Sequence, residues 1–278
     1  MRDDLAAATA TLARAGVETP RADAEWLLAG LLGVGRATLA LGLDRGLDAD
    51  VVRRYDVAVR RRAAREPLQR ILGWEGFRGL RLRITRDVLV PRPETETLVE
   101  WALELVPEPR LAIDVGTGSG CIACAIAAER RAARVVAIDA SPAAAAVARS
   151  NVLSLGLGDR VRVVAADTLT SIGAIGADLM VANLPYIATP TLATLAPEVV
   201  EHEPRVALDG GPDGLGAIRR LVATAGERLA RGGVLVLETA GGTQTPVVVE
   251  LMRTAGFAGV ATCADLPGVE RFVAGRAG

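Results

Sequence analysis

The sequence has no lysine and few cysteine or aromatic residues. All of its 32 basic residues are arginine, and 33 acidic residues bring the formal net charge to −1. A protein that lives on nucleic-acid phosphates carries a basic excess, so this balance argues against that class. Three cysteines are too few for a disulfide framework and indicate a reducing, cytoplasmic compartment. No apolar run reaches the roughly 18 residues that suggest a membrane span.

Three parts of the chain differ in their hydrophobic pattern. Residues 1–72 carry leucines and valines at spacings of three, four and seven, which predicts helices. Leu80, Leu82 and Ile84 alternate with arginines, which predicts a short hairpin. From about residue 110, strand-like and helical segments alternate, as in a mostly parallel sheet. We therefore predict a helical domain over 1–72, a hairpin linker over 73–89 and an α/β domain over 90–278.

An arginine cluster lies within the predicted helical domain, between Arg53 and Arg62. Asp48 or Asp50 is suited to cap the helix that carries it. The pattern favours a solvated helix face. The alternative is a docking face for an acidic or RNA-bound partner.

A glycine-rich segment follows the first predicted strand of the α/β domain, Leu111–Val115. Its residues are Gly116, Thr117, Gly118, Ser119 and Gly120, and a predicted helix follows from Cys121. Glycines let the backbone pass close to a ligand, and the helix N-terminus supplies N–H groups. A dinucleotide fingerprint requires glycine or alanine where this chain has Cys121, so the spacing favours an S-adenosylmethionine loop over an NAD loop.

Acidic residues end the next two predicted strands. Asp139 lies about 20 residues after the glycine loop, where a carboxylate can bridge two ribose hydroxyls. Asp167 and Thr168 follow the third strand and are placed to border an adenine ring. For both aspartates a plain strand-end carboxylate is the alternative.

The fourth predicted strand ends in Asn183-Leu184-Pro185-Tyr186. The Asn183 side-chain oxygen and the Leu184 carbonyl can each accept one N–H, which makes a clamp for a planar amino group. Pro185 stiffens the turn, and Tyr186 offers a face for stacking. The alternative is an ordinary strand-to-loop turn with an asparagine cap.

Further candidates are less specific. Arg92 precedes a predicted helix and Glu94 lies in its first turn, and both either serve the helix entry or contribute to the pocket. The segment 198–216 is loop-rich and suggests a lid, and its His202 is a conceivable base but is more typical of a surface residue. Cys121 and Cys124 are expected to be packing residues, and no metal site is predicted.

Several segments together resemble the release-factor glutamine N5-methyltransferase family, the HemK type of class I methyltransferase. They are Val90–Glu96, Asp114–Gly120, Asn183–Tyr186, Leu208–Leu215 and Cys263–Arg271. The resemblance implies a seven-stranded Rossmann-like sheet with its last strand antiparallel and an N-terminal helical substrate-docking domain.

The resemblance also implies a reaction. S-adenosylmethionine would donate a methyl group to the glutamine of the Gly-Gly-Gln loop of a peptide chain release factor, leaving S-adenosylhomocysteine. Gly116 to Gly120, Asp139, Thr168 and Asn183 would line the cofactor site. We expect a cytoplasmic monomer that contacts neither nucleic acid nor membrane directly.

Two positions depart from the family pattern. Leu184 stands where the family usually has proline, but a leucine carbonyl is the same acceptor. Thr168 stands where some members carry an aromatic residue. Because the clamp also suits adenine N6 or guanine N2, an N-methyltransferase acting on a nucleic-acid base is the alternative function. A non-catalytic binding protein is a third class.

Overall fold

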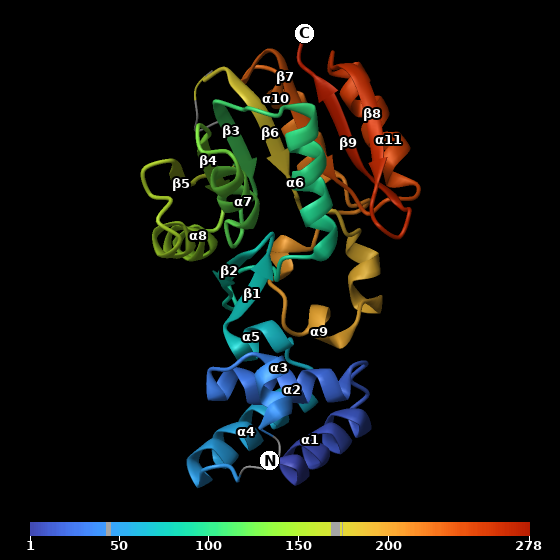
Figure 1. Cartoon of the computed structure of the whole chain (residues 1–278). Helices are drawn as coiled ribbons and strands as arrows, with labels where there is room; N and C mark the ends of the chain where they lie inside the picture. The colour runs from blue at the N-terminus through green and yellow to red at the C-terminus, as the bar shows by residue number, and fades with distance from the viewer. Residues whose placement is uncertain (43–45, 168–172, 174) are drawn as a thin grey trace. The chain divides into compact units, whose positions relative to one another are not determined.

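The computed structural model describes the whole chain except residues 43–45, 168–172 and 174 (Figure 1). Thr168, a predicted cofactor residue, therefore lies outside the described residues. The chain forms two compact units, Met1–Trp74 with Ala196–His202 and Glu75–Leu195 with Glu203–Gly278. The sequence-based domain boundaries stay predictions. In the described part, no helix has the length and apolar character needed to cross a membrane.

The first unit is helical. Its helices are α1 (Arg2–Arg14), α2 (Pro20–Leu32), α3 (Arg36–Leu41), α4 (Ala49–Ala63), α5 (Leu68–Leu72) and the short α9 (Pro197–Val200). Pro20 occupies the first turn of α2, and Gly33 ends that helix at a φ of 66°. The Asp48 side chain accepts a hydrogen bond from the Asp50 backbone at 2.7 Å, so Asp48 is the cap of α4.

The arginines of α4 have different surroundings. Arg53, Arg54 and Arg60 are exposed, as the solvated-face prediction requires. Arg62 is buried, and its guanidinium contacts Asp23 at 2.7 Å and Glu198 at 3.1 Å. For Arg62 the solvated-face prediction is wrong, because the side chain closes an ion-pair network inside the helical unit.

The second unit is built on a seven-stranded sheet in the order β5-β4-β3-β6-β7-β9-β8. The strands are β3 (Leu111–Val115), β4 (Arg134–Asp139), β5 (Val161–Ala165), β6 (Ala177–Ala182), β7 (Leu229–Glu238), β8 (Ala258–Ala264) and β9 (Glu270–Arg276). Strands β3 to β7 pair in parallel, and β9 runs antiparallel to β7 and β8. The predicted seven-stranded sheet with an antiparallel last strand is confirmed.

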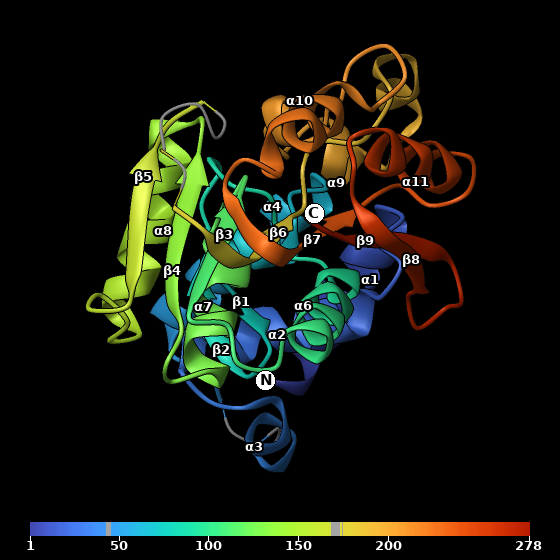
Figure 2. The ribbon, with the colours of Figure 1, turned by 90° about the horizontal axis from the view of Figure 1, so that it is seen from above.

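Helices cover both faces of this sheet. They are α6 (Pro93–Leu105), α7 (Cys121–Glu129), α8 (Pro142–Ser154), α10 (Gly216–Ala225) and α11 (Gln244–Thr254). Figure 2 shows α6 and α7 on one side of the central strands and α10 and α11 on the other. Alternate strand residues supply the two cores: Ala112 packs with α6 and α7, whereas its neighbour Ile113 packs with α10 and α11.

A two-stranded hairpin precedes α6. It consists of β1 (Trp74–Phe77) and β2 (Leu80–Arg83), joined by Arg78 and Gly79, both with positive φ. Phe77 and Leu82 are fully buried in the same core as α6. The hairpin therefore anchors the segment that leads into α6.

One predicted boundary is wrong. Gly232 and Gly233 predict a connection between a helix over 217–230 and a strand over 234–238, whereas α10 ends at Ala225 and β7 already begins at Leu229. Gly232 and Gly233 lie inside β7, where the pairing with β6 shifts register. Glycines in a strand mark such irregularities as often as they mark a loop.

Candidate functional site

The register of the sheet brings three predicted site segments together. Val115, the last residue of β3, pairs with Ile138 of β4 and with Ala182 of β6. The residues that follow these positions, Gly116, Asp139 and Asn183, therefore meet at one edge of the sheet. The carboxyl ends of parallel strands are where open α/β sheets bind ligands.

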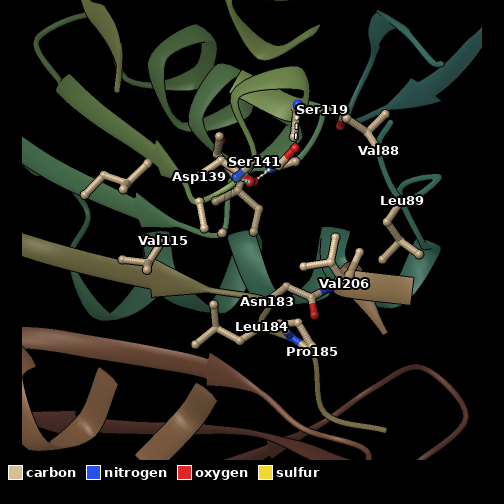
Figure 3. Close-up of a pocket in the computed structure, with 18 of the residues that line it drawn as sticks. Val88, Leu89, Val115, Ser119, Asp139, Ser141, Asn183, Leu184, Pro185 and Val206 are labelled. Carbon is tan, nitrogen blue, oxygen red and sulfur yellow. Dashed lines mark hydrogen bonds between the residues drawn. The ribbon is translucent and has the colours of Figure 1, made fainter. Parts of the chain in front are cut away.

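A cavity of about 480 Å³ lies at this edge, which is in the range of small-molecule sites. In Figure 3, Asp139 and Ser141 lie on one side of it and Asn183, Leu184 and Pro185 on the opposite side. The lining residues come from the glycine loop, the ends of β4, β5 and β6, the approach to α6, the segment before α10 and α10 itself.

The glycine loop between β3 and α7 adopts a conformation that needs its glycines. Gly116, Gly118 and Gly120 have φ values of 74°, 54° and 82°. A side chain at Gly116 would also place its Cβ 2.8 Å from the Leu184 side chain. The backbone N–H groups of Gly116 and Thr117 both donate to the Ile138 carbonyl at 2.9 Å. The loop thus lies open to the cavity, close to both neighbouring strands.

A buried aspartate supports the loop from below. Asp114 is fully buried, and its Oδ2 accepts from Thr117 Oγ1 at 2.5 Å and from the Ala123 backbone at 3.1 Å. Burial raises the pKa of Asp114 to about 7, although both hydrogen bonds oppose the shift. Asp114 is not among the described residues that line the cavity. Its role is to hold the loop and the start of α7.

Asp139 is also engaged by backbone groups. Its two carboxylate oxygens accept from Gly118 N and Ser141 N, both at 2.8 Å. Burial raises its pKa, against these two hydrogen bonds. A carboxylate has about four acceptor positions, so two remain for a ligand. The predicted contact with ribose hydroxyls is therefore compatible with the geometry and stays a prediction.

Sequence reasoning missed Asn151 on α8. This buried side chain donates to the Ser119 carbonyl at 2.8 Å and to the Arg83 carbonyl at 3.1 Å, and accepts from Arg83 N at 2.8 Å. It joins the glycine loop to the hairpin. A polar residue in an otherwise apolar helix face was the available signal.

The turn after β6 presents two acceptors. Asn183 Nδ2 donates to Thr95 Oγ1 at 3.0 Å, so the amide nitrogen is used inside the protein. Within the described part of the chain, no hydrogen bond reaches Asn183 Oδ1 or the Leu184 carbonyl. Asn183 and Leu184 both line the cavity. The amino clamp that the sequence predicts at this turn stays a prediction.

Glycines of the segment before α10 back this turn. Ile187 N donates to the Leu208 carbonyl at 3.0 Å, and Gly210 N donates to the Ile187 carbonyl at 2.9 Å. A Cβ on Gly210 would lie 2.6 Å from the Pro185 carbonyl, and one on Gly214 would lie 2.2 Å from the Tyr186 carbonyl. Residues 208–216 thus buttress the turn, and the lid suggested for the segment 198–216 stays a prediction.

The remaining predicted residues are distributed differently. Arg92 and Asp167 line the cavity, and Arg92 Nη2 lies 3.4 Å from the buried Glu203. Glu94 and Tyr186 are not among the described lining residues. Tyr186 instead directs its hydroxyl to Glu238 Oε1 at 3.2 Å, so its predicted stacking role stays untested.

His202 is not among the described residues that line the cavity, whereas Cys121 is. His202 belongs to the helical unit, where its Nε2 lies 3.4 Å from the Ala64 carbonyl. Cys121 and Cys124 are buried free thiols. No group of side chains suited to hold a metal ion is present among the described residues.

Family models match two parts of the chain. Residues 4–73 match the PrmC N-terminal domain, and residues 92–210 match the ribosomal protein L11 methyltransferase (PrmA) model. These matches assign the helical part and the glycine-loop part to different models.

Curated relatives extend over nearly the whole chain. The release factor glutamine methyltransferase of Geobacter sulfurreducens is 42% identical over 96% of this chain and 93% of its own. That of Cereibacter sphaeroides is 43% identical over 99% of this chain and 97% of its own.

Solved structures share the fold. The hMettl16 catalytic domain in complex with a MAT2A 3′UTR hairpin superposes with a TM-score of 0.60, at 18% identity, over 83% of this chain and 81% of its own. A methyltransferase from Pyrococcus furiosus gives a TM-score of 0.55 at 18% identity, over 72% of this chain and 90% of its own. The fold is that of a methyltransferase, and by its full-length sequence similarity the chain belongs to the release factor glutamine methyltransferase family.

Proposed function

We propose that this protein transfers a methyl group from S-adenosylmethionine to the side-chain amide nitrogen of the glutamine in the Gly-Gly-Gln loop of peptide chain release factors. One observation carries the proposal. Asn183 Oδ1 and the Leu184 carbonyl are two unused acceptors on one wall of a cavity, and the glycine loop lies on another. Family membership supports the choice of a glutamine amide as the planar amino group.

The residues present fit S-adenosylmethionine. The absence of side chains at Gly116 and Gly118 leaves backbone exposed to the cavity, and Asp139 retains acceptor positions for ribose hydroxyls. Val115, Ile138 and Ala166 add an apolar wall. Asp167 borders this wall and would lie near the adenine. When bound, the cofactor supplies an electrophilic methyl group on a sulfonium.

The protein's own contribution is to orient the nucleophile. An amide nitrogen is a poor nucleophile because its lone pair is delocalised into the carbonyl. Acceptors on both N–H groups fix the direction of that nitrogen and stabilise the positive charge that grows on it during transfer. The extra proton can leave after transfer, so no dedicated base is required. His202 accordingly has no step in this mechanism.

A release factor with an intact Gly-Gly-Gln loop tests the proposal, alongside the same factor with that glutamine replaced. The expected result is one added methyl group on the glutamine side chain, mapped by mass spectrometry, and none on the replaced factor. Transfer RNA and DNA are assayed in parallel, because an exocyclic amino group of a base suits the same clamp. Methylation of adenine or guanine without methylation of the release factor would overturn the proposal.

A further inference from the structure

A chain of buried hydrogen bonds leads away from the clamp. Asn183 Nδ2 donates to Thr95 Oγ1 at 3.0 Å, and Thr95 Oγ1 donates to Glu238 Oε2 at 2.9 Å. The other oxygen, Glu238 Oε1, accepts from the Tyr186 hydroxyl at 3.2 Å. Thr95 and Glu238 are 2% and 1% exposed, so bulk water competes little for these hydrogen bonds.

The donor and acceptor roles in this series of hydrogen bonds are set by Glu238. When Glu238 is ionised it only accepts, so in that state the hydroxyls of Thr95 and Tyr186 both point their protons toward it. With its own proton used, Thr95 Oγ1 is left as an acceptor for the Asn183 carboxamide. Only the NH₂ end of the carboxamide can satisfy it.

This matters because an asparagine side chain has nearly the same shape in its two amide orientations. In one orientation Asn183 presents Oδ1 to the cavity and can accept a substrate N–H. In the other it presents N–H donors, which cannot bind an amide NH₂. Whether Asn183 can accept a hydrogen bond from the substrate therefore depends on Thr95, the group that binds the other end of its amide.

We propose that Thr95 and Glu238 are positioning residues, which hold the Asn183 carboxamide with its oxygen toward the substrate, and that Tyr186 braces Glu238 as the second donor. The inference rests on the proposed function, since it assigns these residues to the same clamp. Neither residue needs to touch the reacting nitrogen.

The placement of Glu238 supports this assignment. A carboxylate without solvent is costly to bury and is retained where its charge or acceptors are used. Glu238 ends β7, next to β6, and Thr95 lies in the first turn of α6. The turn, the helix and the strand thus meet at one carboxylate, which is more than core packing requires.

Thr95→Val is the primary test, because it removes the hydroxyl and keeps the shape. We expect kcat for release factor methylation to fall by less than the roughly 10²–10³-fold cost of losing one oriented hydrogen bond in an active site, because Asn183 itself remains. The KM for release factor and the Kd for S-adenosylmethionine should change less than about threefold, since the binding surfaces remain. Thr95→Ser keeps the hydroxyl and should recover most of kcat. Thr97→Val, on a half-buried threonine of the same helix, is the matched control and should resemble wild type.

A double-mutant cycle with Asn183→Ala separates positioning from general stability. If Thr95 acts through Asn183, Thr95→Val should have almost no further effect on kcat in the Asn183→Ala background. Glu238→Gln should lower kcat by a smaller factor, because glutamine can still accept from one hydroxyl. It also serves as the second variant should Thr95→Val fail to fold.

Three results would overturn the inference: wild-type kcat in Thr95→Val, an equal loss in Thr97→Val, or additive losses in the cycle. A wild-type enzyme that leaves the release factor unmodified would instead refute the proposed function. The two failures are therefore distinguishable.

Discussion

The glycine loop after β3 and the turn after β6 lie at neighbouring strand ends but are held in place in different ways. The loop is supported by side chains no more than 32 residues away: Asp114 binds Thr117 and Ala123, Asp139 binds Gly118, and Asn151 binds Ser119. The turn depends on remote groups. Thr95 is 88 residues from Asn183, and Glu238 is 52 residues from Tyr186.

This difference suggests that the two regions have separate roles in cofactor binding and in methyl transfer. The loop exposes backbone to the cavity, and changes there should act on cofactor binding. The turn exposes two acceptors, and changes there should act on the rate of transfer. If this division holds, cofactor affinity and the rate of transfer should respond separately to changes in the two regions.

Asn183→Ala should give the largest loss. It removes one of the two acceptors, so kcat should fall about 10²–10³-fold while the Kd for S-adenosylmethionine stays near wild type. Steady-state methylation and calorimetry measure the two quantities. Near-normal turnover in this variant would refute the clamp.

Each of the two regions has a buried carboxyl group next to it, Asp114 at the glycine loop and Glu238 at the turn after β6. We expect both to make stability depend on pH. Burial raises the pKa of Asp114 to about 7, and burial, opposed by hydrogen bonds from Thr95 and Tyr186, raises that of Glu238 to about 7. Arg271 lowers the pKa of Glu238 and Glu94 raises it. The folded-state pKa of each carboxyl is above its unfolded-state pKa. The stability that each protonated carboxyl contributes is therefore fully present below about pH 4 and is lost as the pH rises through about 7.

Ionisation of each carboxyl should therefore lower the unfolding free energy by up to about 4 kcal/mol between pH 4 and 8. Glu238→Gln and Asp114→Asn should each reduce the decrease in unfolding free energy that the wild type shows between pH 4 and 8, as measured by denaturant unfolding at several pH values. Only Glu238→Gln should also lower kcat at saturating cofactor. Equal loss of kcat in both variants would contradict the proposal that the turn, and not the glycine loop, controls the rate of transfer.

Gly214→Ala tests the buttress behind the turn. Gly214 has a φ of 78°, and an added Cβ would lie 2.2 Å from the Tyr186 carbonyl, so the turn must shift. We expect kcat to fall about 10-fold with little change in cofactor Kd, since a misplaced group in an active site costs rate. Gly256→Ala is the control, because it shares a positive φ of 87° but meets no atom within 4 Å. Equal kcat in the two variants would contradict a buttress role.

Asp139→Asn should give the smallest effect. Asparagine has one acceptor oxygen, so the bond to Gly118 N or to Ser141 N is lost, and the loss of one hydrogen bond is worth about 1 kcal/mol. The Kd for S-adenosylmethionine should rise about fivefold, and kcat at saturation should be unchanged. Asp159→Asn, at an exposed position, is the control. An unchanged Kd would remove Asp139 from the cofactor site.

The sequence alone predicted most of the fold, because hydrophobic periodicity and glycine placement are local signals. The seven strands, the helical N-terminal part and the glycine loop all followed from spacing or from family resemblance. The exception at Gly232 and Gly233 arose because a register shift inside a strand resembles a turn in the sequence. The burial of Arg62 could not be predicted because its partner Glu198 lies 136 residues away in the sequence.

That Asn183 and Leu184 can offer acceptors follows from their residue types alone. Which end of the Asn183 amide faces the cavity depends on the folded structure. That orientation depends on Thr95 and Glu238, whose sequence positions carry no mark of a shared role. Helix α6 and strand β7 bring them together because both pack against β6, and hydrogen-bond direction is defined only once the partners meet.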